Sequence, residues 1–364
     1  MNISKFFLKV ALLFLLVVGL NYILRSFVPY FWHTEFLANY EQLLEEDKNI
    51  NTLFLGSSRI ANGIVPEVFD DEVAKLNGPL VKSFNIAIPG VANGENYRMI
   101  HRIINEKKFD NIKYVFLEMG SINYSVGDQF CADKVVHSAK TTYWLDKTAT
   151  QSSIQDVWNH PFDQKARKRY IQNYLVGFLQ NQFNAGYYES FLDFYYKRDI
   201  ENFGKGTRES NGYRNAEKSK SRLMKKNRKD YVQSDGKLSK AKAQASRKVF
   251  SGEYDVTIKN QQNLDHLHQL IETAKAQKVH LFFHIPPLVN AKYYPEIVAL
   301  YRKLPDAHKL QTSNVFEFPE LYEMEYIYDG THLKEKGAAL ASQYLAQKFV
   351  HFKYNKGLLG EKLP

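Results

Sequence analysis

The chain has 364 residues and a net charge of +10, from 49 Lys and Arg against 39 Asp and Glu. Hydrophobic residues make up 44% of the sequence and aromatic residues 14%, which excludes an intrinsically disordered chain and allows a sizeable folded core. The single cysteine, Cys131, excludes an intrachain disulfide, so cysteine usage does not identify the compartment.

The first element along the chain is an apolar segment over residues 6–24, FFLKVALLFLLVVGLNYIL. About 20 apolar residues span the hydrocarbon core of a bilayer, and this segment is just long enough. Lys5 and Lys9 precede its centre, and no small-residue cleavage site follows it. We therefore predict an uncleaved signal anchor within residues 1–32. It would cross the cytoplasmic (inner) membrane once and leave the later domains on the extracytoplasmic, periplasmic side. The alternative is a helix buried in a protein core.

After a helical linker over residues 33–50, short apolar runs alternate with helix-compatible stretches. The runs typical of buried strands are 52–55, 83–86, 114–119, 279–285 and 314–318, and the expected helices are 94–107, 260–277, 294–303 and 333–350. Such alternation is typical of crossover connections between parallel strands. It predicts an α/β fold class, a three-layer α/β/α domain with about five mostly parallel strands. This domain comprises residues 51–124 and 259–352, and a tail over 353–364 follows it.

A long insertion, residues 125–258, interrupts this alternation, and we expect it to be largely helical and to pack beside the carboxyl edge of the sheet. Residues 137–200 are rich in aromatic side chains. Residues 205–248 contain 15 Lys or Arg and 4 Asp or Glu, a net charge of +11. This basic segment is predicted to be either a solvated, mobile loop or a contact with anionic lipid headgroups or an anionic envelope polymer. Nucleic acid is not an expected partner, because an exported segment would rarely meet it.

The stretch NTLFLGSSR, residues 51–59, contains the main candidate for chemistry. An apolar strand ends at Gly56, and Ser57 and Ser58 follow where a turn would expose a hydroxyl at the carboxyl edge of the sheet. A nucleophilic serine needs a base and a group that orients the base. Asp329 and His332, three residues apart in YDGTH, are expected on one loop at the same edge. Asp329 would orient His332, which would take the proton of Ser58.

Three motifs in this order resemble those of the SGNH (GDSL-type) hydrolase family: GSSR at 56–59, FNIAIPGVANGE at 84–95 and DGTH at 329–332. The resemblance covers residues 50–350 apart from the insertion. It implies a flavodoxin-like α/β/α fold, with Ser58 as the nucleophile, His332 as the base and Asp329 as the orienting acid. It also implies that the backbone amides of Ser58 and Gly90 stabilise the oxyanion.

A further block of the family pattern, Gly-x-Asn-Asp after the third strand, is not matched in this chain. Here the chain reads GSIN at 120–123, so Ile122 occupies the position of the oxyanion asparagine. Asn123 takes that role only after a one-residue slip. Loss of one oxyanion donor costs about 100- to 1,000-fold in rate. The sequence therefore leaves two functions open, a serine O-acyltransferase or esterase and a degenerate scaffold without turnover.

The apolar N-terminal segment, the GSSR motif and the insertion together resemble the membrane-anchored branch of that family, which includes DltD-like and alginate-acetylation proteins. This resemblance implies an envelope polysaccharide as substrate and a membrane-bound O-acyltransferase as partner.

Two further residues have alternative interpretations. Arg59 is expected to bind a substrate carboxylate or phosphate, or else to form a local salt bridge. His284 is expected to line the pocket, or else to be a hydrogen-bonded histidine at a strand end. No cofactor is expected, because the glycines form no phosphate-binding loop. No metal site is expected either, because His266 and His268 lie two apart on a predicted helix and cannot share a face.

Overall fold

The structure is a computed structural model, and it describes residues 3–27, 39, 42–43, 49–89, 99–100, 103–104, 111–119, 147–159, 162–183, 210–253, 261–291 and 293–355. The chain divides into two compact units. Unit 1 comprises residues 1–38 and 123–203, and unit 2 comprises residues 39–122 and 204–364.

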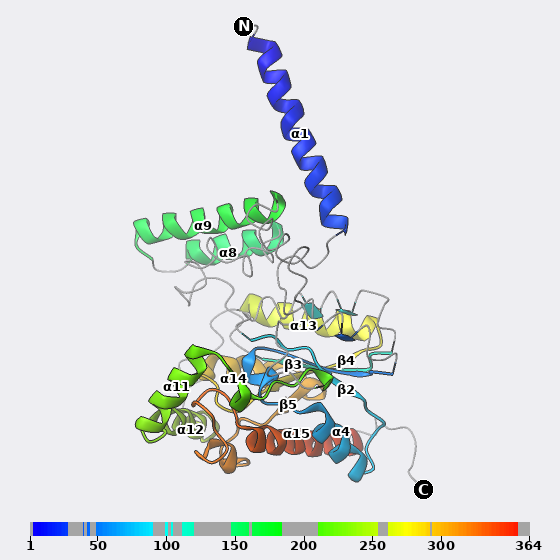
Figure 1. Cartoon of the computed structure of the whole chain (residues 1–364), viewed down its shortest axis with the longest axis vertical. Helices are drawn as coiled ribbons and strands as arrows, with labels where there is room; N and C mark the ends of the chain where they lie inside the picture. Colours follow the sequence, from blue (N-terminus) through cyan, green and yellow to red (C-terminus); the bar gives the residue numbers. More distant parts are fainter. Residues whose placement is uncertain are drawn as a thin grey trace. The chain divides into compact units, whose positions relative to one another are not determined.

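Unit 2 is built on a five-stranded sheet (Figure 1). Its strands are β1 Thr52–Leu55, β2 Ser83–Asn85, β3 Tyr114–Glu118, β4 His280–Ile285 and β5 Lys309–Gln311. The strand order is β2-β1-β3-β4-β5, and every neighbouring pair is parallel. The predicted α/β class and the parallel five-stranded sheet are therefore confirmed.

The prediction of the last strand was wrong, because β5 lies at Lys309–Gln311 and not at 314–318. The side-chain oxygen of Gln311 accepts the backbone N–H groups of Ser313 and Asn314, both at 2.8 Å, which turns the chain immediately after β5. Phe318 N–H then bonds back to the carbonyl of Asn314, so residues 314–318 form a turn. Phe316 is exposed there, although the apolar run predicts a buried strand.

The core of unit 2 is a cluster of aromatic rings on one face of the sheet. Phe54, Phe116 and Phe282 are in register on β1, β3 and β4, with neighbouring ring centroids 5.0 and 5.1 Å apart. Phe69 of α4 (Pro66–Lys75) and Phe349 of α15 (Glu335–Asn355) pack on them. In Figure 1, α13 (Gln261–Ala276) covers the opposite face of the sheet. Because rings interlock from strands and helices, the strand ends that carry the site are held rigidly.

The helices predicted at 260–277, 294–303 and 333–350 are confirmed as α13, α14 (Tyr294–Lys303) and α15. Unit 2 also contains short helices: α3 Ser58–Ala61, η2 Ser210–Gly212, η3 Ala216–Lys218, η4 Asp306–His308 and η5 Pro319–Tyr322. The predicted helix at 94–107 and the linker at 33–50 lie mostly outside the described residues.

The basic segment 205–248 is not a solvated loop, because its second part forms α11 (Arg222–Gln233) and α12 (Lys237–Phe250). These two helices, the basic hairpin, meet at Gly236, whose φ of 66° is left-handed. The buried residues of α12 recur mostly at helical spacing, and all but Lys242 and Val249 have small side chains: Ser239, Lys242, Ala243, Ala245, Ser246 and Val249. Small, polar side chains conceal this period in the sequence. The predicted insertion is also not one element, since 123–203 belongs to unit 1 and the basic hairpin to unit 2.

Unit 1 contains α1 (Ile3–Phe27), α8 (Lys147–Asn159) and α9 (Gln164–Phe183). Helices α8 and α9 pack side by side around Val157, Tyr170 and Tyr174, which confirms a helical part within residues 137–200 (Figure 1). Among the residues that the structure describes, no helix has both the length and the hydropathy needed to traverse a bilayer. The single-pass anchor therefore stays a prediction.

Candidate active site

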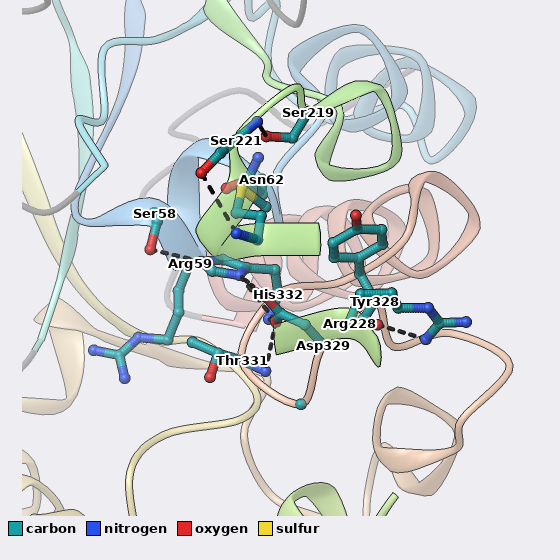
Figure 2. Close-up of polar contacts among 12 residues, drawn as sticks. Ser58, Arg59, Asn62, Ser219, Ser221, Arg228, Tyr328, Asp329, Thr331 and His332 are labelled. Carbon is teal, nitrogen blue, oxygen red and sulfur yellow. Dashed lines mark hydrogen bonds and ion pairs between the residues drawn. The ribbon is translucent and has the colours of Figure 1, made fainter. Parts of the chain in front are cut away.

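Ser58 comes together in unit 2 with His332 and Asp329, which lie on one loop more than 270 residues later in the chain (Figure 2). His332 Nε2 lies 2.8 Å from Ser58 Oγ. His332 Nδ1 lies 2.9 Å from Asp329 Oδ2 and 3.0 Å from Oδ1. A carboxylate beside Nδ1 favours the tautomer that carries its proton there, which leaves Nε2 to accept the serine proton. The three side chains thus have the geometry of an activated hydroxyl, its base and the group that orients the base.

The position of Ser58 follows from the strand that precedes it. Strand β1 ends at Leu55, and Ser57 caps α3 by accepting the Arg59 N–H at 3.3 Å, so Ser58 is the first residue of that helix. The side chain of Asn85, the last residue of β2, donates to the carbonyls of Ile60 and Ile64, both at 2.9 Å. The short helix α3 is therefore held at its start by Ser57 and at its end by Asn85.

Asp329 is a buried carboxylate held by its own loop. Its Oδ1 accepts the backbone N–H groups of Thr331 and His332, at 3.1 and 3.0 Å. Burial by itself would raise the pKa of Asp329, but the hydrogen bonds and charge of His332, with these backbone bonds, outweigh it and hold the pKa below its usual value. The carboxyl is therefore ionised at neutral pH, as an orienting acid must be.

Glu118, at the end of β3, supports the serine turn from the neighbouring strand. Its Oε2 accepts the Ser57 N–H at 2.6 Å, and its Oε1 lies 2.8 Å from both Nε and a terminal nitrogen of Arg59. The Glu118 side chain is fully buried. Gly56 faces it so closely that an added Cβ would lie 2.6 Å from Oε2. The turn that presents Ser58 is thus built around one buried ion pair.

The basic hairpin holds the loop that carries Asp329 and His332. Arg228 of α11 donates to the backbone oxygens of Ile327 and Tyr328, and its guanidinium lies over the Tyr328 ring (Figure 2). Lys242 of α12 is buried, and its Nζ donates to Gly330 O at 2.8 Å and to Thr331 Oγ1 at 3.3 Å.

Gly330 adopts φ +78°, and a Cβ there would meet Leu238 and Tyr231 of the same hairpin at 3.0 Å. The hairpin therefore fits against the loop by side-chain hydrogen bonds and by close packing on a residue that has no side chain. Burial and the nearby charge of Arg59 lower the pKa of Lys242 to about 7, against the opposing effect of Asp329.

Arg59 and His284, the two weaker candidates, have positions that match the structural role predicted for each. Arg59 forms the predicted local salt bridge, with Glu118, and its side chain is 19% exposed. His284, at 1% exposed, is buried at the end of β4, where Nε2 lies 3.1 Å from Thr312 Oγ1. Burial lowers the pKa of His284 to about 3, so this histidine is neutral. It therefore matches the alternative of a hydrogen-bonded histidine at a strand end.

The remaining oxyanion candidates, Gly90 and Asn123, lie outside the described residues, as does Ile122. Within the described ranges, no group of His, Cys, Asp and Glu side chains could hold a metal ion.

Glu118, Lys242 and Arg228 were missed by sequence reasoning. Glu118 gave a usable signal, because an acidic residue at the end of the buried run YVFLE needs a partner. Lys242 and Arg228 gave none, because they are two of 15 basic residues in a polar segment and nothing nearby distinguishes them.

Comparisons with family models, with curated proteins and with solved structures found no match. The function of the chain is therefore inferred from the geometry of the site and from the motifs.

Proposed function

We propose that this protein is a membrane-anchored, extracytoplasmic serine O-acyltransferase or esterase with a flavodoxin-like SGNH fold, acting on an envelope polysaccharide. The observation that carries the proposal is the hydrogen-bonded series Ser58–His332–Asp329, with 2.8 Å from Ser58 Oγ to His332 Nε2 and 2.9 Å from Nδ1 to the carboxylate. It joins two loops 274 residues apart in the chain. The motif resemblance supports the family assignment, and the geometry of the three side chains supports serine chemistry.

In this mechanism Ser58 Oγ attacks the carbonyl carbon of an ester or thioester while His332 Nε2 takes its proton. Asp329 holds the imidazole and stabilises the imidazolium that forms. The tetrahedral oxyanion is received by the proposed donors, the backbone amides of Ser58 and Gly90 and the side chain of Asn123. His332 then returns the proton to the leaving alkoxide or thiolate as the carbonyl bond to it breaks. A sugar hydroxyl or water repeats these steps on the acyl-enzyme.

The test uses purified protein, short acyl esters and a serine-directed phosphonate. We expect mass spectrometry to find the phosphonate on Ser58, and Ser58→Ala to lose both the adduct and ester turnover. Ser57→Ala is the matched control, because that hydroxyl only caps α3. Absence of an adduct, together with normal behaviour of Ser58→Ala in cells, would contradict the proposal.

The second candidate is a degenerate scaffold that binds a polymer or a membrane-bound O-acyltransferase without turnover. The observation that favours it is Ile122 at the place of the family's oxyanion asparagine. Mass spectrometry of envelope glycans from a strain without the protein separates the activities: missing O-acylation indicates a transferase, and excess O-acylation indicates an esterase. Loss of O-acylation that Ser58→Ala restores would indicate the scaffold.

The proposed location is tested by cysteine labelling of engineered single sites beyond residue 50. Labelling in intact cells whose outer barrier is permeable supports the extracytoplasmic placement. Labelling only after the inner membrane is broken contradicts it.

An anionic polymer or lipid is the proposed partner of the basic hairpin. Deletion of this segment is not a clean test, because Arg228 and Lys242 hold the Asp329 loop. Substituting Lys225, Lys226 and Lys229 with Gln is cleaner, since all three are exposed on α11. We expect weaker binding to an anionic polymer and a smaller effect of salt, with small-ester turnover unchanged.

A further inference from the structure

Residues 212–217, which we call the strap, belong to unit 2 and contact three of its elements. All of them except the last are buried. Gly212 has φ +78°, and a Cβ there would lie 2.1 Å from the carbonyl oxygen of Asn85, the last residue of β2. The strap therefore begins against the sheet at a distance that only a glycine permits. Its other two contacts are with α3 and α15.

The strap is bonded to the helix that carries the candidate nucleophile. Ser58 begins α3, and Asn62 is the residue that ends it (Figure 2). Arg214 N–H donates to Ala61 O at 2.9 Å, and Asn62 Nδ2 donates back to Arg214 O at 2.7 Å. Asn62 N–H in turn donates to Ser58 O at 2.9 Å. Two hydrogen bonds, made by the buried Asn62 and Arg214, thus join the strap to α3 one turn after Ser58.

The next residue of the strap is bonded to the start of α15. Asn215 Nδ2 donates to Glu335 Oε2 at 2.7 Å, and Asn215 Oδ1 accepts the Glu217 N–H at 2.9 Å. Glu217 Oε2 accepts the N–H of Glu335, the first residue of α15, at 3.0 Å. A carboxylate stabilises this end of a helix, where N–H groups have no partner within the helix. The strap therefore holds α15 three residues after His332.

The loop of His332 is joined to the start of α15 by its own backbone. Tyr328 N–H donates to His332 O at 2.8 Å, and Lys334 N–H donates to Tyr326 O at 2.9 Å. These bonds close the loop immediately before Glu335. A displacement of the first turn of α15 is therefore passed on to the imidazole.

We propose that the strap sets the distance between Ser58 Oγ and His332 Nε2, with Asn62 and Asn215 as positioning residues. The serine and the histidine are 274 residues apart in the chain. Two adjacent residues, Arg214 and Asn215, each hold one of their loops. A nucleophile and its base must be held within about 0.5 Å of their productive geometry, which loops seldom achieve without such support. This role rests on the proposed serine chemistry.

The first test reverses the polarity of one hydrogen bond. Asn215→Asp keeps an oxygen for the Glu217 N–H but places a second carboxylate against Glu335. We expect kcat on a short acyl ester, and the rate of phosphonate labelling of Ser58, to fall about tenfold. KM should stay the same, since no contact with the ester changes. Adding Glu335→Gln should restore both rates, because the new amide can donate to the new carboxylate and the net charge returns to its original value.

Asn62→Ala breaks the other end of the strap without changing any charge, and kcat should again fall about tenfold. Two breaks in one series act as one, so Asn62→Ala with Asn215→Asp should be at most about twofold slower than the slower single variant, whereas independent effects would multiply to about 100-fold. The matched control is Asn51→Ala. It loses bonds to Leu80 O and Lys82 N–H, both at 3.0 Å, before the start of β1. Its unfolding midpoint should fall while kcat is unchanged.

A second measurement does not depend on turnover. In a Cys131→Ser background, Ser58→Cys places a thiol beside His332, and the pH dependence of its alkylation by iodoacetamide gives its pKa. A neighbouring imidazolium lowers the pKa of a thiol below its usual value of about 8.5. Adding Asn62→Ala should raise this pKa back toward about 8.5. Adding Asn51→Ala should leave it lowered.

Several results would overturn the proposal: a wild-type kcat in Asn62→Ala, an equal loss of kcat in Asn51→Ala, or a thiol of ordinary pKa before any change to the strap. Failure of Glu335→Gln to rescue Asn215→Asp would also overturn it, and this pair decides the question if Asn62→Ala does not fold. A lowered thiol pKa that Asn62→Ala raises, in a protein without ester turnover, would support the strap and contradict the proposed reaction.

Discussion

The buried carboxylate of Glu118 accepts the backbone N–H of Ser57 at 2.6 Å, one residue before the candidate nucleophile. The same carboxylate pairs with Arg59, one residue after it. Ser58 is therefore flanked on both sides by residues anchored to a single side chain of the neighbouring strand, β3. A hydroxyl held in this way keeps its distance to His332 without needing a contact of its own with the rest of the core.

Glu118→Gln should destabilise the protein and slow the labelling of Ser58 by phosphonate. Glutamine keeps an oxygen for the Ser57 N–H, but it leaves the Arg59 guanidinium without a carboxylate. Breaking a buried ion pair from one side costs about 3–5 kcal/mol, and partial exposure of Arg59 places the expected loss at the lower end. Urea unfolding measures it. Adding Arg59→Met to Glu118→Gln should recover most of the stability, and a double variant no more stable than the single one would contradict this account.

Gly56→Ala should be destabilising by about 1–3 kcal/mol, because its Cβ would overpack the serine turn. The new atom would lie 2.4 Å from Ile60 Cγ1 and 2.6 Å from Glu118 Oε2. Gly19→Ala in α1 is the matched control, since no atom lies within 4 Å of a Cβ there. Thermal unfolding of both variants, with phosphonate labelling of Ser58, separates loss of stability from displacement of the hydroxyl. Equal behaviour of the two variants would show that the turn can relax.

The sequence predicted Ser58, Asp329 and His332 because each of these residues follows a local signal. A strand that ends at Gly56 and a short Asp-x-x-His spacing are patterns within a few residues, and the parallel sheet then brings both loops to one edge. Strands β1 to β4 are likewise apolar runs bounded by turns. These features depend on residues that are close together in the chain, so they can be recognised in the sequence alone.

The residues that sequence reasoning missed depend on contacts across the fold. Lys242 becomes a buried donor only because α12 lies against a loop 88 residues later. Strand β5 was misplaced because the Gln311 side chain turns the chain before the next apolar run begins. For Lys242 the deciding contact is tertiary, and nothing in its own segment indicates it. For β5 the deciding contact is a local side-chain hydrogen bond, which a search for apolar runs does not register.

Acid should destabilise the protein through two neutral histidines, the buried His284 and the half-buried His280. Burial lowers the pKa of His284 to about 3 and is the main cause that lowers the pKa of His280 to about 4. Between these values and the usual 6.5, the unfolded chain binds protons that the native protein does not, so stability falls as pH falls. The slope is at most about 1.4 kcal/mol per pH unit for each histidine.

His284→Gln should make the dependence of unfolding free energy on pH shallower below pH ~6.5, the usual pKa of histidine. Glutamine retains a polar group that can bond to Thr312 Oγ1, which limits the loss of that hydrogen bond. Urea unfolding at several pH values measures the slope. His268→Gln is the control, because that side chain is exposed on α13. An unchanged slope in His284→Gln would show that this histidine is not the acid-sensitive group.

Lys242 should make the protein more stable as pH rises above neutral. Its pKa in the native protein is lowered to about 7, first by burial and then by the charge of Arg59, while Asp329 acts in the opposite direction. Between pH ~7 and the unfolded value of 10.5, the unfolded chain carries a proton that the native chain has lost. The free energy of unfolding should therefore increase by up to about 1.4 kcal/mol per pH unit in that window.

Lys242→Met should remove this increase, because methionine has a similar length and no proton to lose. It should also slow phosphonate labelling of Ser58, since Gly330 O and Thr331 Oγ1 lose their donor and the loop of Asp329 and His332 is held less firmly. Lys237→Met, exposed on the same helix, is the matched control and should change neither quantity. Urea unfolding between pH 7 and 10 tests the pH dependence of the free energy of unfolding. An equal increase with pH in Lys242→Met and in wild type would contradict the role of Lys242. Labelling at pH ~7 tests the second effect: a wild-type rate in Lys242→Met would show that the basic hairpin covers the loop without positioning it.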